Sequence, residues 1–184
     1  MIDRELIRIF REVGRDLFVA GLTTSHGGNM SVRDGGRVII TRRGSMLGRL
    51  TDDDLIETGI EPCAADERCS RELVVHRAIY AATDARAIVH AHPPHTVARS
   101  FSADVIAPAD SEGLYVLGEV PVVTAAQTIA SPEAAEVLAE ALRGAPIAVL
   151  RTHGPFARGA SLDEAFMHVS VLEASATILD LLGR

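Results

Sequence analysis

Apolar residues recur every three or four positions in several stretches of the chain, and this spacing predicts amphipathic helices. Aspartate or serine stands where most of these helices should begin, as helix N-caps prefer. Ser161 and Glu164 form a capping box in front of the last helix. The predicted helices span residues 4–20, 71–82, 94–102, 132–144 and 162–182.

Shorter apolar runs bounded by turn residues predict strands. Two of these runs flank Asp34-Gly35-Gly36, a turn sequence that is typical of a β-hairpin. Another run contains Pro121, which favours an edge strand because proline has no N–H to donate. Hairpins mixed with helices indicate a mostly antiparallel sheet that is covered by helices. The expected strands span residues 30–33, 37–41, 88–92, 105–107, 120–123, 147–150 and 156–159, with a short turn over 52–56 and loops over 59–69 and 108–113.

Length, composition and charge fit a globular protein. The 184 residues can bury a sizeable core, and we expect a single domain spanning residues 1–184. No apolar run is long enough to cross a membrane and the N-terminus has no signal-peptide pattern, so a cytoplasmic location is expected. The net charge of -7 and the scattered basic residues argue against a nucleic-acid partner. Cys63 and Cys69 lack a Cys-x-x-Cys spacing and are expected to be free thiols.

All 18 basic residues of the chain are arginines, and lysine is absent. No lysine side chain is therefore available to form a Schiff base with a carbonyl substrate. If this protein performs carbanion chemistry, it needs another electron sink, and a metal ion is the obvious one.

Histidines stand at the points where two predicted strands end. His90 and His92 follow an apolar run that Pro93 cannot continue, and alternate strand residues share one face. Such a pair can simply bond to the backbone, but His153 ends a second apolar run in the same way. Three neutral imidazoles with an open fourth position are a known catalytic zinc arrangement. The sequence therefore predicts a metal site at these three histidines.

The other four histidines have different expected roles. His76 and His168 lie inside predicted helices, where packing or surface positions are expected. His95 follows two prolines and is a candidate to support the metal ligands from behind. His26 lies in a glycine-containing loop, where it could meet a substrate.

Glu72 is the candidate acid–base residue. It falls in the first turn of a predicted helix, behind a possible Ser70 cap. Position alone favours a simpler role, in which the carboxylate pairs with the helix dipole. Proton transfer is the alternative interpretation.

Two polar loops are candidate anion sites. The glycines of Gly27-Gly28-Asn29 let the backbone approach a ligand closely, although many such loops are only turns. Arg43-Gly44-Ser45 and Ser70-Arg71 add N–H, hydroxyl and guanidinium donors. Arginine is well shaped to bind phosphate or carboxylate.

The order and spacing of these residues resemble the class II aldolase and adducin-head family over nearly the whole chain. The resemblance implies a three-layer fold, in which a mostly antiparallel sheet lies between helices, and a homotetramer. The matching motifs are Gly28-Asn29-Met30-Ser31-Val32-Arg33, Thr41 to Gly44, Leu50 to Asp54, Ser70 with Glu72, His90-Ala91-His92 and Thr152-His153-Gly154.

The resemblance also implies roles for individual residues. A divalent ion, usually zinc, would be held by His90, His92 and His153, and Glu72 would be catalytic. The substrate phosphate would lie near Asn29, Gly44 and Ser70. The predicted substrate-binding residues are Gly28, Asn29, Arg43, Gly44, Ser70 and Arg71.

The chain departs from the fuculose-phosphate-cleaving members of the family at the anion site. Arg43 and Arg71 stand where those members have serine. Their loop tyrosine has no clear match, since Asp110 and Glu112 occupy that region and Tyr115 is only nearby. Substrate identity therefore stays open at this point.

We expect a metal-dependent aldolase that cleaves a small phosphorylated ketose of the L-fuculose 1-phosphate type through an enediolate. A sugar-phosphate 4-epimerase with Asp110 or Glu112 as an extra acid–base group is one alternative. A decarboxylase of sugar-acid phosphates is another. A non-catalytic adducin-like scaffold would be expected to lack the three histidines.

Overall fold

The computed structural model describes residues 2–183 and is built around one eight-stranded sheet with the order β3-β2-β1-β4-β8-β7-β6-β5. Neighbouring strands are antiparallel except β6 and β7, which are parallel. The sheet is therefore mixed but mostly antiparallel, as the hairpin signals predict. The strands are β1 (Asn29–Asp34), β2 (Arg37–Thr41), β3 (Leu55–Gly59), β4 (Ala87–His90), β5 (Val105–Ile106), β6 (Val120–Val123), β7 (Ile147–Leu150) and β8 (Gly154–Gly159).

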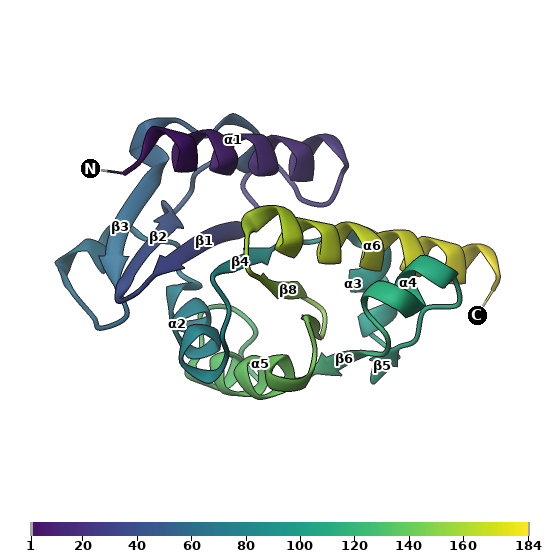
Figure 1. Ribbon diagram of the computed structural model, residues 1–184. Helices are drawn as coiled ribbons and strands as arrows, with labels where there is room; N and C mark the ends of the chain where they lie inside the picture. Colours follow the sequence, from purple (N-terminus) through teal and green to yellow (C-terminus); the bar gives the residue numbers. More distant parts are fainter. Residues whose placement is uncertain (1, 184) are drawn as a thin grey trace.

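Helices cover both faces of the sheet, which gives the expected three layers (Figure 1). α1 and α6 pack on one face, and α2 and α5 pack together on the other. α3 and α4 lie against α6. No helix within residues 2–183 is both long and apolar enough to span a bilayer. The helices are α1 (Arg4–Val19), α2 (Leu73–Ala82), α3 (Pro94–Ser100), α4 (Ser111–Val116), α5 (Pro132–Gly144) and α6 (Leu162–Leu181), and short 3₁₀ turns are η1 (Leu47–Arg49), η2 (Asp52–Asp54) and η3 (Ala64–Arg68).

The central strands contribute side chains to two cores. Ala87 and Val89 of β4 face the α1/α6 layer, whereas Ile88 between them faces the α2/α5 layer. Successive strand residues point to opposite faces, so a strand covered on both sides must be apolar throughout. This is why β4 and β7 show continuous apolar runs in the sequence.

Side-chain caps begin the helices where the sequence predicts them. Asp3 accepts a hydrogen bond from the Glu5 N–H at 3.0 Å, and Ser131 accepts one from the Ala134 N–H at 2.9 Å. α2 begins two residues later than predicted, because Ser70 Oγ accepts from the Glu72 N–H in a preceding turn. Glu72 consequently occupies the N-cap position, and its side chain makes no capping hydrogen bond.

Two elements differ from the sequence prediction. Residues 55–59 form β3 rather than a turn and loop, because antiparallel pairing with β2 places Ile56 opposite Ile40. Residues 111–116 form α4 rather than loop, capped by Asp110. Gly113 argues against a helix on propensity, yet a Cβ there would lie 2.2 Å from Ser175 Oγ of α6. Close packing between α4 and α6 therefore explains the glycine.

The predicted edge position of β6 is wrong. β5, only two residues long, pairs with β6 on the outer side and forms the edge itself. The parallel pairing of β6 with β7 uses Val122 and Val123. Pro121 lies outside that pairing, so its missing N–H leaves no gap in the hydrogen-bond ladder between β6 and β7.

Candidate active site

Five strand ends meet at one edge of the sheet. Antiparallel neighbours run in opposite directions, so β1 and β8 begin where β2, β4 and β7 end. Asn29 lies opposite His90 in the β1–β4 register, and Gly154 lies opposite Leu150 between β8 and β7. This edge surrounds a pocket of about 340 Å³. Its lining includes every site residue predicted from the sequence: Gly28, Asn29, Arg43, Gly44, Ser70, Arg71, Glu72, His90, His92 and His153.

The glycine loop that precedes β1 packs tightly against the histidine segment. A Cβ on Gly27 would lie 2.7 Å from His92 Nδ1, and a Cβ on Gly28 would lie 2.5 Å from the His90 carbonyl oxygen. Gly28 also has a φ of +75°, a conformation that L side chains rarely adopt. These glycines therefore let the loop close over the strand end that carries the histidines.

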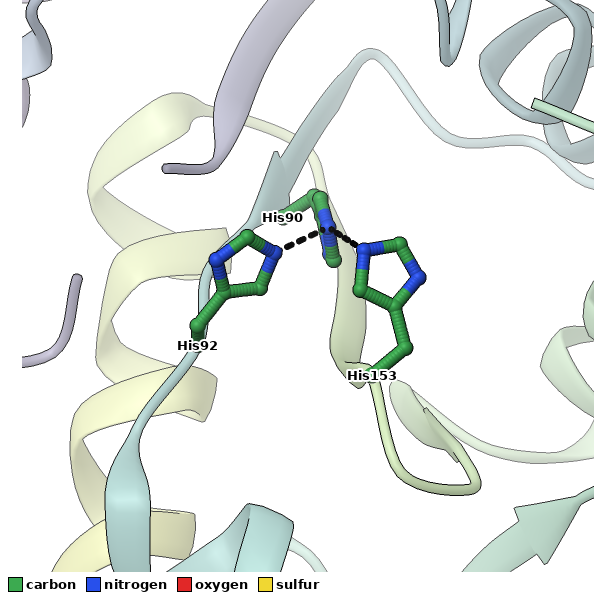
Figure 2. A group of neighbouring side chains, drawn as sticks. All are labelled: His90, His92 and His153. Atoms are coloured by element: carbon green, nitrogen blue, oxygen red, sulfur yellow. Dashed lines mark hydrogen bonds between the residues drawn. The ribbon is translucent and has the colours of Figure 1, made fainter. Parts of the chain in front are cut away.

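The three predicted ligands converge, with His92 and His153 on either side of His90 (Figure 2). His90 Nε2 is 2.9 Å from His92 Nε2 and 3.3 Å from His153 Nε2. A tetrahedral zinc site with Zn–N bonds of about 2.1 Å separates its nitrogens by about 3.4 Å. The three side chains thus offer one ligand atom each to a single ion.

The hydrogen bonds behind the rings direct their lone pairs inward. His90 Nδ1–H donates to the Pro155 carbonyl and His153 Nδ1–H donates to the Thr128 carbonyl, both at 2.9 Å. Each of these rings is then unprotonated at Nε2, which is the state a metal requires. Burial lowers the pKa of His92 to about 4 and that of His90 well below its usual range, which also favours neutral rings. The donor set therefore fits a divalent ion such as zinc.

Glu72 is buried in the same pocket, with 4% of its surface exposed. Burial raises the pKa of its carboxyl to about 7, against a weaker opposing effect of a hydrogen bond from the Ala130 N–H. Its Oε1 accepts that bond at 3.2 Å, whereas its Oε2 has no partner among residues 2–183. Burial thus outweighs the helix-dipole pairing that sequence position favours. Both protonation states of this carboxyl are accessible near neutral pH.

The segment from Thr128 to Ala130, which no sequence pattern marks, supports both His153 and Glu72. The Thr128 carbonyl fixes His153, and two residues later the Ala130 N–H binds Glu72. Ala130 has a φ of +55°, and Thr152, next to His153, has a φ of +65°. Left-handed conformations of non-glycine residues are strained and concentrate at functional sites. A sequence offers no signal for such positions, because neither residue is a glycine or asparagine.

Two exposed arginines lie at the rim of the pocket. Arg43 and Arg71 are exposed, line the pocket and form no ion pair with any residue from 2 to 183. Asp52, which lies nine residues after Arg43 in the sequence, pairs with Arg11 at 2.6 Å. Arg42, which also lines the pocket, is already bound to Asp54. The rim therefore carries two cationic donors that face a ligand-sized space.

Of the remaining four histidines, His26 and His168 lie where the sequence predicts, whereas His95 and His76 have partners that it does not predict. His26 lines the pocket, as expected. His95 does not support the metal ligands, because its Nδ1 pairs with Asp180 on α6. His168 is buried and donates from Nδ1 to the Arg158 carbonyl. His76 is also buried, and it is hydrogen-bonded to Asn29 of the pocket rather than simply packed.

The acids and the tyrosine near α4 lie away from this pocket. Asp110 caps α4 by accepting from the Gly113 N–H at 2.7 Å, and the neighbouring Ser175 hydroxyl helps to lower its pKa. Glu112 and Tyr115 are exposed on α4. None of the three lines the pocket. Cys63 and Cys69 are free thiols, the first exposed and the second buried.

Comparison with known proteins gives consistent matches. The family model described as Class II Aldolase and Adducin N-terminal domain matches residues 8–179. The L-fuculose phosphate aldolase of Methanocaldococcus jannaschii is 30% identical over 99% of this chain and 98% of its own. A 3-oxo-tetronate 4-phosphate decarboxylase of Haemophilus influenzae is 29% identical over 97% of this chain and 88% of its own. The crystal structure of L-fuculose-1-phosphate aldolase from Thermus thermophilus has a TM-score of 0.95 and 44% identity, over 98% of this chain and 95% of that chain.

The family model and the fold lead to the same assignment. The model match covers nearly all of the described residues, and the structural match extends over the sheet and both helical layers. The chain therefore belongs to the class II aldolase and adducin N-terminal domain family.

Proposed function

We propose that this protein is a metal-dependent aldolase, an aldehyde-lyase that cleaves a small phosphorylated ketose of the L-fuculose 1-phosphate type. One observation carries the proposal: three imidazole Nε2 atoms converge beside a buried, readily protonated carboxyl and two exposed arginines in one pocket. The pocket thus combines a place for an electron sink, a proton carrier and an anion site. The M. jannaschii and T. thermophilus relatives carry the matching name.

Different residues of the pocket would have different roles in this reaction. His90, His92 and His153 would hold a divalent ion, which supplies Lewis-acid stabilisation of the enediolate left when the C–C bond breaks. Glu72, protonated, would deliver its proton to the enediolate carbon, and in the reverse direction its carboxylate would remove that proton. Zinc suits three imidazoles, and a homotetramer is the assembly that the family resemblance implies.

The anion site would hold the substrate phosphate away from the reacting carbon. The Asn29 amide, the Gly44 backbone and the Ser70 hydroxyl supply neutral donors, and Arg43 and Arg71 supply charged ones. Holding the substrate by its phosphate places the carbonyl end near the histidines and turns binding energy into orientation.

Decarboxylation is the second candidate, because relatives such as the H. influenzae protein are named 3-oxo-tetronate 4-phosphate decarboxylases. Loss of CO₂ from a 3-oxo acid also leaves an enolate, so the same ion and the same Glu72 would serve. The 4-epimerase has weaker support, since neither Asp110 nor Glu112 lines the pocket. A non-catalytic scaffold does not account for the convergent histidines.

A product assay separates these reactions. Metal-loaded protein is incubated with L-fuculose 1-phosphate, with its ketose 1-phosphate diastereomers and with 3-oxo-tetronate 4-phosphate. We expect release of dihydroxyacetone phosphate and an aldehyde from a ketose 1-phosphate. Release of CO₂ from the 3-oxo acid alone would replace the aldolase with a decarboxylase, and a new sugar-phosphate diastereomer would indicate an epimerase. No turnover by fully metal-loaded protein would favour the scaffold.

Removing either rim arginine should weaken binding of the phosphorylated substrate. Arg71→Ala or Arg43→Ala is expected to raise KM by roughly 10-fold or more, since a hydrogen bond to a charged group is worth about 1.5–3 kcal/mol. The loss should largely vanish with the dephosphorylated ketose. Steady-state kinetics on both substrates make the comparison.

Arg15→Ala is the matched control for the arginine variants, because Arg15 is exposed on α1 and lies outside the pocket lining. It should leave both KM values unchanged. Equal losses on both substrates for the rim variants would assign the arginines a structural role. If neither rim variant has an effect, the phosphate is held by the neutral donors alone.

A further inference from the structure

A chain of buried hydrogen bonds runs from α2 to the pocket. Asn29 and Ser31 are two residues apart on β1 and therefore lie on the same face of that strand. His76 and Tyr80 are one turn apart on α2, so they lie on one face of that helix and meet the β1 pair. His76 Nε2 is 2.6 Å from Asn29 Oδ1, and His76 Nδ1 is 2.6 Å from Ser31 Oγ. Ser31 Oγ is in turn 2.7 Å from the Tyr80 hydroxyl. Asn29 is the only one of these four residues that lines the pocket.

The imidazole of His76 can supply only one proton to this chain. The ring is fully buried, and burial lowers its pKa to about 3, so it is neutral at physiological pH. A neutral imidazole donates from one nitrogen and accepts at the other. The two hydrogen bonds of the ring must therefore run in one direction, either toward Asn29 or away from it.

The two hydroxyls at the far end decide the direction. If the chain runs from Tyr80 to Asn29, the Tyr80 and Ser31 hydroxyls and the His76 Nε2–H each donate to the next residue. If it runs the other way, His76 Nδ1–H donates to Ser31 Oγ, and the Ser31 and Tyr80 hydroxyls have two protons for the one bond between them. Among residues 2–183 the Ser31 hydroxyl bonds only to His76 and Tyr80, and the Tyr80 hydroxyl bonds only to Ser31, so one buried hydroxyl proton would have no acceptor. Buried donors without acceptors are costly, so the direction toward Asn29 is the stable one.

We infer that His76 is a positioning residue, which acts as the Nε2–H tautomer to hold the Asn29 carbonyl oxygen and thereby turn the Asn29 amide N–H₂ toward the anion in the pocket. The inference rests on the proposed function, in which the pocket takes a phosphate. With the amide reversed, the carbonyl oxygen would face the phosphate and repel it. The orientation of an active-site amide thus depends on a histidine that never touches the substrate.

The tautomer can be observed directly. In wild-type protein labelled with ¹⁵N-histidine, long-range ¹H–¹⁵N spectra at pH 7.5 should show the His76 proton on Nε2. Tyr80→Phe is the matched control, because Ser31 then has His76 as its one acceptor and the tautomer should persist. A wild-type proton on Nδ1 would overturn the inference.

Binding tests whether His76 acts through Asn29. Inorganic phosphate is titrated calorimetrically into the metal-loaded protein, and metal content is measured for every variant. His76→Leu and Asn29→Ala should each weaken phosphate binding about 10-fold, because either change removes one fixed donor to a charged group. His76→Gln, which can again donate to Asn29 Oδ1, should recover most of that loss, and Tyr80→Phe should bind within about two-fold of wild type.

The double variant gives the sharpest outcome. If His76 works through Asn29, then Asn29→Ala with His76→Leu should bind phosphate no more weakly than Asn29→Ala alone. Additive losses would mean that His76 supports the structure in general, and the inference would fall. Binding that Asn29→Ala weakens and His76→Leu does not would overturn the inference alone. Absence of any phosphate binding by wild type would overturn the proposed phosphate site together with the inference.

Discussion

Replacing His92 with alanine should abolish stable metal binding and, with it, turnover. His92 supplies one of three imidazole ligand atoms that lie within 4.8 Å of one another, so its loss leaves two ligands. Even residues that only orient a metal ligand are worth 10- to 100-fold in affinity, and we expect a loss above roughly 100-fold here. Wild-type protein should contain about one divalent ion per chain. Elemental analysis of the purified variant and a metal titration measure both quantities.

His95→Ala is the control for this experiment. His95 is exposed, pairs with Asp180 and lies outside the pocket lining, so its removal should leave metal content and turnover unchanged. Full metal content in His92→Ala would show that the three histidines are not the ligands. Equal metal loss in both variants would point to general destabilisation.

Glu72→Gln should reduce turnover by roughly 10²- to 10⁴-fold, the usual contribution of a positioned acid–base group. Glutamine has the same size but cannot carry the proton, so metal content and KM should change little. Product formation under saturating substrate measures the effect. Near-normal turnover would assign the proton transfer to another residue, and Asp110→Asn and Glu112→Gln would be the next variants to compare.

The same substitution should make the protein more stable at alkaline pH. The folded-state pKa of about 7 lies above the ordinary value of 4.5, so the folded state binds the proton more tightly than the unfolded state. Ionisation of Glu72 therefore lowers the free energy of unfolding as the pH rises from about 4.5 to 7, by roughly 3 kcal/mol in total. Glu72→Gln should remove this dependence and raise the free energy of unfolding at pH 8.

Urea unfolding of chelator-treated wild type and variant between pH 4.5 and 8 tests this expectation. The variant should show a flatter pH profile, with the gap widest at pH 8. Parallel profiles would mean that Glu72 titrates normally. A gain in stability together with a loss of turnover is the pattern expected when a buried charge is retained for function.

Local signals in the sequence were sufficient for most of the fold. Capping residues and apolar spacing predict five of the helices, because both act within one or two turns of chain. They miss α4 and β3, because those elements depend on partners far along the chain. Gly113 belongs in α4 only because α6 passes close by, and residues 55–59 extend only because β2 is there to pair with them.

The residues of the site were equally open to prediction, but their states were not. Strand alternation predicts that His90 and His92 share a face, although β4 ends at His90, and the absence of lysine alone excludes a lysine Schiff base. Only the tertiary structure decides that Glu72 is buried and held by an N–H 58 residues away. Only it decides that His76 meets Asn29 while His95 turns to Asp180. The spacing of residues in the sequence indicates which nearby side chains share a face. Burial and hydrogen-bond partners, however, come from distant segments that folding brings together, and these determine the protonation and orientation of each side chain.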